Sequence, residues 1–155
     1  MTIEQLTQKF QEIYDGSPWH GASLMTLLSS IPAEHFTKIV TPGKKSMAHL
    51  LEHMLAWRQL AIEVLKGNKE YDVPINSDKD WPIPKPVGDA KVHYLSKLSE
   101  SQESLLSLLK TKNDDWLQEQ TPNRSYNNAY LIQGIVEHDL YHSGQIGIFN
   151  SLLKD

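Results

Sequence analysis

Two histidines with helical spacing, His138 and His142, lie in the apolar segment 130–149. Residues four apart stack on one face of an α-helix, so two imidazoles at this spacing can point at one metal ion. The pair lies within the hydrophobic stripe of the segment, not opposite it. Imidazoles that face the interior of a helix bundle are either hydrogen-bonded core groups or metal ligands, and both interpretations stay open at this point.

A second pair with the same spacing, His49 and His53, lies in another predicted helix. With seven histidines in 155 residues, chance gives roughly 0.3 such pairs, so two pairs favour a functional role. The apolar series of this helix is Leu50, Trp57, Leu60 and Val64. His53 keeps step with that series, whereas His49 lies about 40° away around the helix. We therefore expect His53 to face the interior.

Three imidazoles would then converge inside the protein, from His53, His138 and His142. Neutral imidazole is a good ligand for zinc, nickel, copper and iron. Three protein ligands leave coordination positions for water or substrate, as in a catalytic site. No carboxylate is placed as a fourth ligand: Glu137 and Asp139 flank His138, but successive helical residues point about 100° apart.

Other residues of the last helix bear on this site more weakly. Gln145, three residues after His142, is a candidate hydrogen-bonding group near the metal, although an ordinary polar residue of the helix is an equal interpretation. Gly134, Gly144 and Gly147 cost helix stability. Either a close approach between helices or space beside the site would explain these glycines.

The elements that must position these residues are predicted to be helices. Apolar residues alternate in steps of three and four over 3–13, 24–31, 47–66 and 127–153, and again in a helix that Asp89 begins and Asn113 ends. Ser46 is predicted as an N-cap and Gly67 as a C-terminal stop, while Pro42-Gly43 predicts a turn. Four long amphipathic segments without strand-like alternation indicate an all-α bundle.

Residues 68–88 form a predicted loop, because they contain four prolines and no helical period. A loop of this length in a compact domain is more often functional than not, and we expect it to shape the entrance to the site. Trp57 and Trp81 are interpreted as packing residues. Residues 121–125 predict a second loop.

Composition limits the function classes. The length of 155 residues fits one domain, 1–155, and the absence of cysteine excludes thiolate metal sites and cysteine nucleophiles. A net charge of −4 without a basic face argues against nucleic acid as a partner. The first ten residues do not resemble a secretory signal, and no apolar stretch approaches the ~20 residues that span a bilayer. We expect a cytoplasmic protein with no membrane partner.

Three motifs resemble the DinB/YfiT-like superfamily of small metal-binding helix bundles, which is unrelated to the translesion polymerase of similar name. They are Gly16-Ser-Pro-Trp-His-Gly21, Ser46-Met-Ala-His-Leu-Leu-Glu-His-Met-Leu-Ala-Trp-Arg58 and His138-Asp-Leu-Tyr-His-Ser-Gly-Gln-Ile146. The resemblance runs from about residue 10 to the C-terminus. It implies a four-helix bundle, often a homodimer, with a three-histidine site for a divalent metal, commonly nickel or zinc. The family histidines match His53, His138 and His142, and His49 has no assigned counterpart.

The resemblance also implies candidate activities. Some members are bacillithiol S-transferases or mycothiol-dependent isomerases, and these use a low-molecular-weight thiol. The hypothesis is therefore a metal-dependent enzyme, a thiol S-transferase or a hydrolase, that acts on a small-molecule substrate. The alternative is a non-catalytic metal-binding or stress-response bundle protein.

Overall fold

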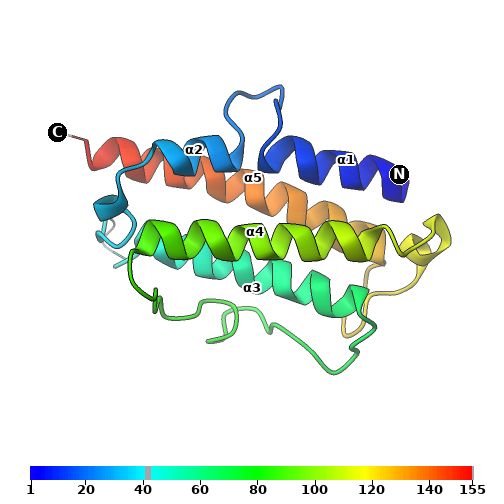
Figure 1. Ribbon diagram of the computed structural model, residues 1–155. Coiled ribbons are helices and arrows are strands. Elements are labelled where there is room, and N and C mark those ends of the chain that lie inside the picture. The colour runs from blue at the N-terminus through cyan, green and yellow to red at the C-terminus, as the bar shows by residue number, and fades with distance from the viewer. Residues whose placement is uncertain (41–42, 155) are drawn as a thin grey trace.

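The computed structural model describes residues 1–40 and 43–154, and over these residues it is helical (Figure 1). The α-helices are α1 (Ile3–Tyr14), α2 (Leu24–Ser30), α3 (Met47–Leu65), α4 (Ala90–Leu109) and α5 (Asn128–Leu152). Two short 3-10 helices are η1 (Ala33–His35) and η2 (Asp114–Gln118). The β-pairing found in the described part of the chain is an isolated bridge between Gln120 and Asn127. The prediction of an all-α protein is confirmed.

The predicted count of four helices is not confirmed, because the described residues form five α-helices. The extra element is α2, a helix of seven residues. It follows α1 along the same side of the bundle, after the loop 15–23 (Figure 1). Both α1 and α2 contact α4 and α5, so together they cover the side of the bundle that a single interrupted helix would cover. The stretches 3–13 and 24–31, whose apolar spacing predicts helices, correspond to α1 and α2.

The helix boundaries follow the capping signals of the sequence. Ser46 and Asp89 stand at the N-caps of α3 and α4, and the Asp89 carboxylate accepts a hydrogen bond from the backbone N–H of Val92. Gly67 lies just beyond α3 with a φ of 81°, a left-handed conformation that glycine adopts without steric cost. These signals set the ends of α3 and α4, and α3 packs against both α4 and α5.

The interior consists of two apolar clusters with polar residues between them. One cluster includes Leu60 of α3 and Leu131 of α5, and the other includes Leu51 of α3 and Ile146 of α5. Between the two clusters, along α3, α4 and α5, lie the buried polar side chains of Arg58, Gln102 and Asp139, together with those of His53 and His142. The bundle therefore carries a polar layer at its middle, at the level where the histidines of α3 and α5 meet.

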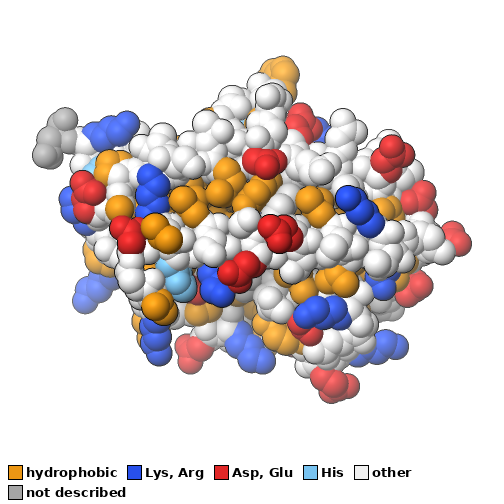
Figure 2. Space-filling view, viewed as in Figure 1, with side chains coloured by type: hydrophobic (Ala, Val, Ile, Leu, Met, Phe, Trp, Pro, Cys, Tyr) orange, Lys and Arg blue, Asp and Glu red, His pale blue; other side chains and the backbone are white. Residues whose placement is uncertain are grey.

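The remaining segments and the surface complete the fold. Residues 66–89 contain no helix or strand, as predicted for the four-proline loop. The predicted turn at Pro42-Gly43 includes a residue outside the described part of the chain. Within the described part, no helix is both long enough and apolar enough to cross a membrane. Figure 2 shows acidic and basic side chains interspersed on the viewed face, without a large area of one sign.

Candidate functional site

Three imidazoles converge where α3 meets α5. The Nε2 atom of His138 lies 3.0 Å from Nε2 of His53 and 3.0 Å from Nε2 of His142. One ring nitrogen from each residue lies within 4.8 Å of the other two. Three nitrogens bound to one tetrahedral zinc ion at 2.0–2.1 Å would lie ~3.3 Å from one another. The structure thus brings the three histidines singled out by the sequence to separations close to those of a metal site.

Hydrogen bonds orient two of the three rings. His53 Nδ1 lies 2.7 Å from the backbone oxygen of Asp80 and 3.0 Å from its Oδ1, and His142 Nδ1 lies 2.6 Å from Gln145 Oε1. Oxygen acceptors at Nδ1 place the proton there and leave the lone pair on Nε2. His138 Nδ1 is buried and has no hydrogen-bond partner among the residues that the structure describes. The Nε2 lone pairs of His53 and His142 therefore face the centre of the group.

The environment keeps the imidazoles of His138 and His142 neutral. Burial and, to a smaller extent, the nearby rings of His142 and His53 lower the pKa of His138 to about 3. Burial also lowers the pKa of His142, against the opposing effect of its hydrogen bond to Gln145. Only a neutral imidazole can donate a lone pair to a metal. At pH 7 the rings of His138 and His142 are therefore ready to bind a metal without first releasing a proton.

Hydrogen bonds among the three rings explain the 3.0 Å separations of their Nε2 atoms less well than a shared metal ion does. With protons on Nδ1 of His53 and His142, only His138 can place a proton among the three Nε2 atoms. That single N–H would have to serve both of the 3.0 Å contacts at once. A cation shared by three lone pairs satisfies all three nitrogens, so the donor set fits a divalent metal better than it fits a hydrogen-bonded core cluster.

Sequence reasoning missed Asp80, which links the four-proline loop to α3. Its Oδ1 accepts a hydrogen bond from Trp57 Nε1 at 2.8 Å as well as contacting His53, and its Oδ2 accepts one from the backbone N–H of Asn76 at 2.8 Å. The following residue, Trp81, stacks on the His53 ring with centroids 3.8 Å apart and planes 4° apart. Trp57 and Trp81, interpreted from sequence as packing residues, both help to fix His53. The signal available in the sequence was the pair Asp80-Trp81 inside a long loop.

The other candidate residues lie outside the centre of the group. Gln145 is behind the His142 ring, where it accepts from Nδ1 and donates through Nε2 to the Tyr141 hydroxyl at 3.2 Å. It is therefore a positioning residue for His142 in this geometry. His49 lies at the start of α3, and its Nδ1 accepts a hydrogen bond from the backbone N–H of Ser46 at 3.2 Å. It does not belong to the three-histidine group found among the described residues.

The glycines of α5 do not mark close helix approach within the described part of the chain. A Cβ atom built at Gly134, Gly144 or Gly147 would meet no heavy atom within 4 Å. Gly134 instead lines a cavity next to the histidines. Of the two explanations drawn from the sequence, space beside the site is thus the one that fits Gly134.

A buried ion pair joins α3 to α5 beside the histidines. Arg58 Nε and Nη2 donate hydrogen bonds to Asp139 Oδ2 at 2.9 and 2.7 Å. Arg58 Nη1 donates to Ser101 Oγ and Gln102 Oε1 of α4. Asp139 directly follows His138, and it points away from the histidine group, as expected for adjacent helical residues. The pair therefore fixes the register of α3 against α5, on which the meeting of the three rings depends.

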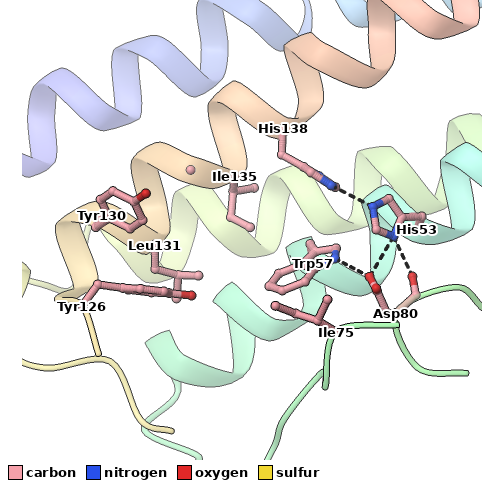
Figure 3. A pocket seen from close by; sticks show the side chains of 10 residues that line it. His53, Trp57, Ile75, Asp80, Tyr126, Tyr130, Leu131, Ile135 and His138 are labelled. Atoms are coloured by element: carbon pink, nitrogen blue, oxygen red, sulfur yellow. Dashed lines mark hydrogen bonds and ion pairs between the residues drawn. The ribbon is translucent and has the colours of Figure 1, made fainter. Parts of the chain in front are cut away.

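Two cavities adjoin the histidine group. The first has a volume of about 330 Å³ and is bounded at one end by His53 and His138 (Figure 3). We call it the apolar cavity, and most of its remaining wall is formed by Trp57, Ile75, Tyr126, Tyr130, Leu131 and Ile135. The second, of about 540 Å³, is lined by all three histidines together with Lys45, Trp81, Tyr141 and Gln145. The group is thus accessible to small molecules from two cavities.

Comparison with known proteins assigns the family. The model of the DinB family matches residues 5–151, which is nearly the whole chain. Searches of the curated proteins and of the solved structures found no match. The family match agrees with the resemblance carried by the histidine motifs, and the helical fold with a buried three-histidine group is consistent with it. This chain belongs to the DinB family.

Proposed function

We propose that this protein is a divalent-metal-dependent enzyme in which His53, His138 and His142 hold the ion. The observation that carries the proposal is the convergence of three Nε2 atoms from two helices, with 3.0 Å between neighbouring nitrogens. The neutral state of His138 and His142 and the Nδ1 contacts of His53 and His142 support it. Three imidazoles match nickel or zinc among the common divalent metals.

A three-histidine site leaves coordination positions for a substrate or for water. The bound metal would supply Lewis acidity, which lowers the pKa of a coordinated water or thiol so that a nucleophile is available at neutral pH. The protein would contribute the orientation of the ligands, through Asp80 and Gln145, and the two adjoining cavities. We propose thiol S-transfer or hydrolysis of a small molecule as the reaction class, with a low-molecular-weight thiol as the cosubstrate of the first.

A non-catalytic metal-binding or stress-response protein is the second candidate. One observation favours it. Asp80 is the carboxylate in contact with the histidine group, and both of its oxygens already accept hydrogen bonds. It lies on the Nδ1 side of His53, away from the converging Nε2 atoms, and so is not placed to move a proton where a substrate would bind.

Activity assays on metal-loaded protein separate the two candidates. We expect the zinc- or nickel-loaded chain to accelerate the conjugation of bacillithiol to a simple electrophile, or the hydrolysis of a small ester. The matched His142→Ala variant should lose this acceleration. If the loaded protein binds its metal but accelerates neither reaction over the rate with free metal, the enzyme proposal fails and the binding function remains.

Asp80 offers a test of ligand orientation. We expect Asp80→Asn to weaken metal affinity by ~10-fold, the lower end of the loss seen when a group that orients a ligating histidine is replaced. The loss is limited because the backbone oxygen of residue 80 still accepts from His53 Nδ1. Isothermal titration with zinc measures the change.

Asp78→Asn is the matched control, since Asp78 is exposed in the same loop and does not belong to the three-histidine group found among the described residues. It should bind zinc as the parent protein does. Equal affinities for Asp80→Asn and the parent would show that the carboxylate does not orient His53.

We also propose that the protein forms a homodimer. Tyr141, Ile148 and Leu152 are 64%, 61% and 66% exposed on α5. Their spacing of seven and four residues places them along one face of that helix, and exposed apolar faces commonly mark contact surfaces. Light scattering coupled to gel filtration gives the oligomeric state: a mass of one chain at micromolar concentration would contradict the dimer.

A further inference from the structure

The apolar cavity beside the histidines presents hydrocarbon and aromatic ring faces to a ligand. Trp57 comes from α3, Ile75 from the four-proline loop, and Leu131 and Ile135 from α5 (Figure 3). The side chains of Ile75 and Tyr130 are 73% and 68% exposed, although both are large and apolar over most of their surface. Exposed apolar groups around a cavity are typical of ligand-binding sites.

Two polar groups at this cavity, the Asp80 carboxylate and the Trp57 indole N–H, are already engaged in hydrogen bonds. Asp80 accepts hydrogen bonds at both carboxylate oxygens, and the indole N–H of Trp57 is one of the donors. Among the described residues, no lysine or arginine lines the cavity. In the metal-free protein an anionic ligand would therefore lose its hydration without gaining an opposite charge, which is costly. The ring nitrogens of His53 and His138 lie at one end, and two tyrosine hydroxyls are the other polar side-chain groups of the lining. The cavity thus suits a neutral molecule whose polar group lies at the histidine end.

The volume of the cavity limits the size of that molecule. An apolar cavity of ~150 Å³ accepts benzene. The cavity here, at about 330 Å³, is large enough for one or two fused rings. Aromatic walls such as Trp57 and Tyr126 favour a flat ring system, because offset or edge contacts between rings add to the free energy of burial.

Gly134 keeps part of the cavity open. It lines the cavity from α5, and a Cβ atom at this position would meet nothing within 4 Å. A larger side chain can therefore be added without a clash at its first atom, and it would occupy space that a ligand needs. Gly147, on the same helix, has equally open surroundings and does not line the cavity.

We infer that the apolar cavity binds a neutral aromatic compound of one or two rings, with its one polar or reactive substituent at the His53 and His138 end. Binding requires the cavity alone. The further role of this compound as the substrate, placed for attack beside the histidines, rests on the proposed function. The inference thus selects uncharged aromatic electrophiles or esters from among the possible small-molecule substrates.

The test uses 2-naphthol as the neutral probe and naphthalene-2-sulfonate as its anionic counterpart, titrated into the metal-free full chain by isothermal calorimetry. We expect one molecule of 2-naphthol to bind per chain, and the sulfonate to bind at least ~10-fold more weakly, because its charge finds no partner in the cavity. Equal binding of the two probes, or no measurable binding of 2-naphthol, would overturn the inference.

Two variants locate the bound probe. Gly134→Leu should weaken 2-naphthol binding by at least ~10-fold, since the leucine side chain occupies the cavity, while the control Gly147→Leu should leave it unchanged. Ile75→Asp changes an exposed loop residue that lines the cavity, so it tests the same site with little risk to folding, and it should also weaken binding. If Gly134→Leu and Ile75→Asp both bind 2-naphthol like the parent protein, the probe lies elsewhere and the inference fails.

The His142→Ala variant separates this inference from the proposed function. His142 does not line the apolar cavity, so this variant should bind 2-naphthol as the parent does even though it should no longer hold the metal tightly. Loss of metal binding with retained naphthol binding is the expected result. Loss of naphthol binding in a variant that still unfolds like the parent would show that the probe depends on the metal site and not on the cavity.

Discussion

Replacing His142 or His53 by alanine is expected to abolish tight binding of zinc or nickel. Each variant removes one of three converging Nε2 atoms. Replacing groups that merely orient a ligating histidine already costs 10–100-fold in affinity, so losing a ligand should cost at least ~100-fold. Competition against a chromophoric chelator measures the affinity, and circular dichroism shows whether each variant keeps its helical structure.

His49→Ala is the matched control for these variants. His49 lies on the same helix as His53, but its ring contacts Ser46 at the helix start and not the histidine group. The variant should bind metal like the parent protein. If His49→Ala loses the metal while His53→Ala keeps it, the assignment of ligands on α3 is wrong.

Asp139→Asn is expected to lower the free energy of unfolding by about 3–5 kcal/mol, the cost of leaving one member of a buried ion pair without its partner. Arg58 and Asp139 are each 1% exposed, and two hydrogen bonds join them. The amide of asparagine keeps the size of the side chain but loses the charge, so the Arg58 guanidinium would be buried without an opposite charge. Urea unfolding followed by circular dichroism measures the change.

A double variant distinguishes charge from packing. Arg58→Met combined with Asp139→Leu removes both charges, and it should recover much of the stability lost in Asp139→Asn, since apolar side chains of similar volume can replace a buried ion pair. Lys97→Gln, which breaks an exposed pair with Glu100, is the surface control and should unfold like the parent. An Asp139→Asn variant as stable as the parent would show that the pair does not hold α3 against α5.

The helices and the three histidines could be predicted from the sequence because both depend on local spacing. Steps of three and four along 47–66 place His53 on the same face as Leu50 and Leu60, and both of these leucines are buried in the structure. Capping residues such as Ser46 and Asp89 then set the helix ends. The four-residue spacing of His138 and His142 needs only a helix to bring their rings together.

Contacts between segments far apart in the chain could not be predicted in this way. Asp80 reaches His53 across 27 residues, and Arg58 reaches Asp139 across 81. The local sequence around neither residue indicates its partner. Asp80 lies in a loop whose apolar residues show no helical spacing. Arg58 is an arginine, a residue that is usually found at the protein surface. The division of the N-terminal helix into α1 and α2 was visible as a break, but how the two pieces pack depends on α4 and α5.

A metal titration shows whether the three converging imidazoles bind one divalent metal ion. The chain is stripped with a chelator, dialysed, and titrated with zinc or nickel while thermal unfolding is followed. We expect one tightly bound ion per chain, and a rise in the free energy of unfolding of ~2.7 kcal/mol once free metal reaches 100 times the dissociation constant. Binding of less than about a tenth of an equivalent, with no change in unfolding, would contradict it.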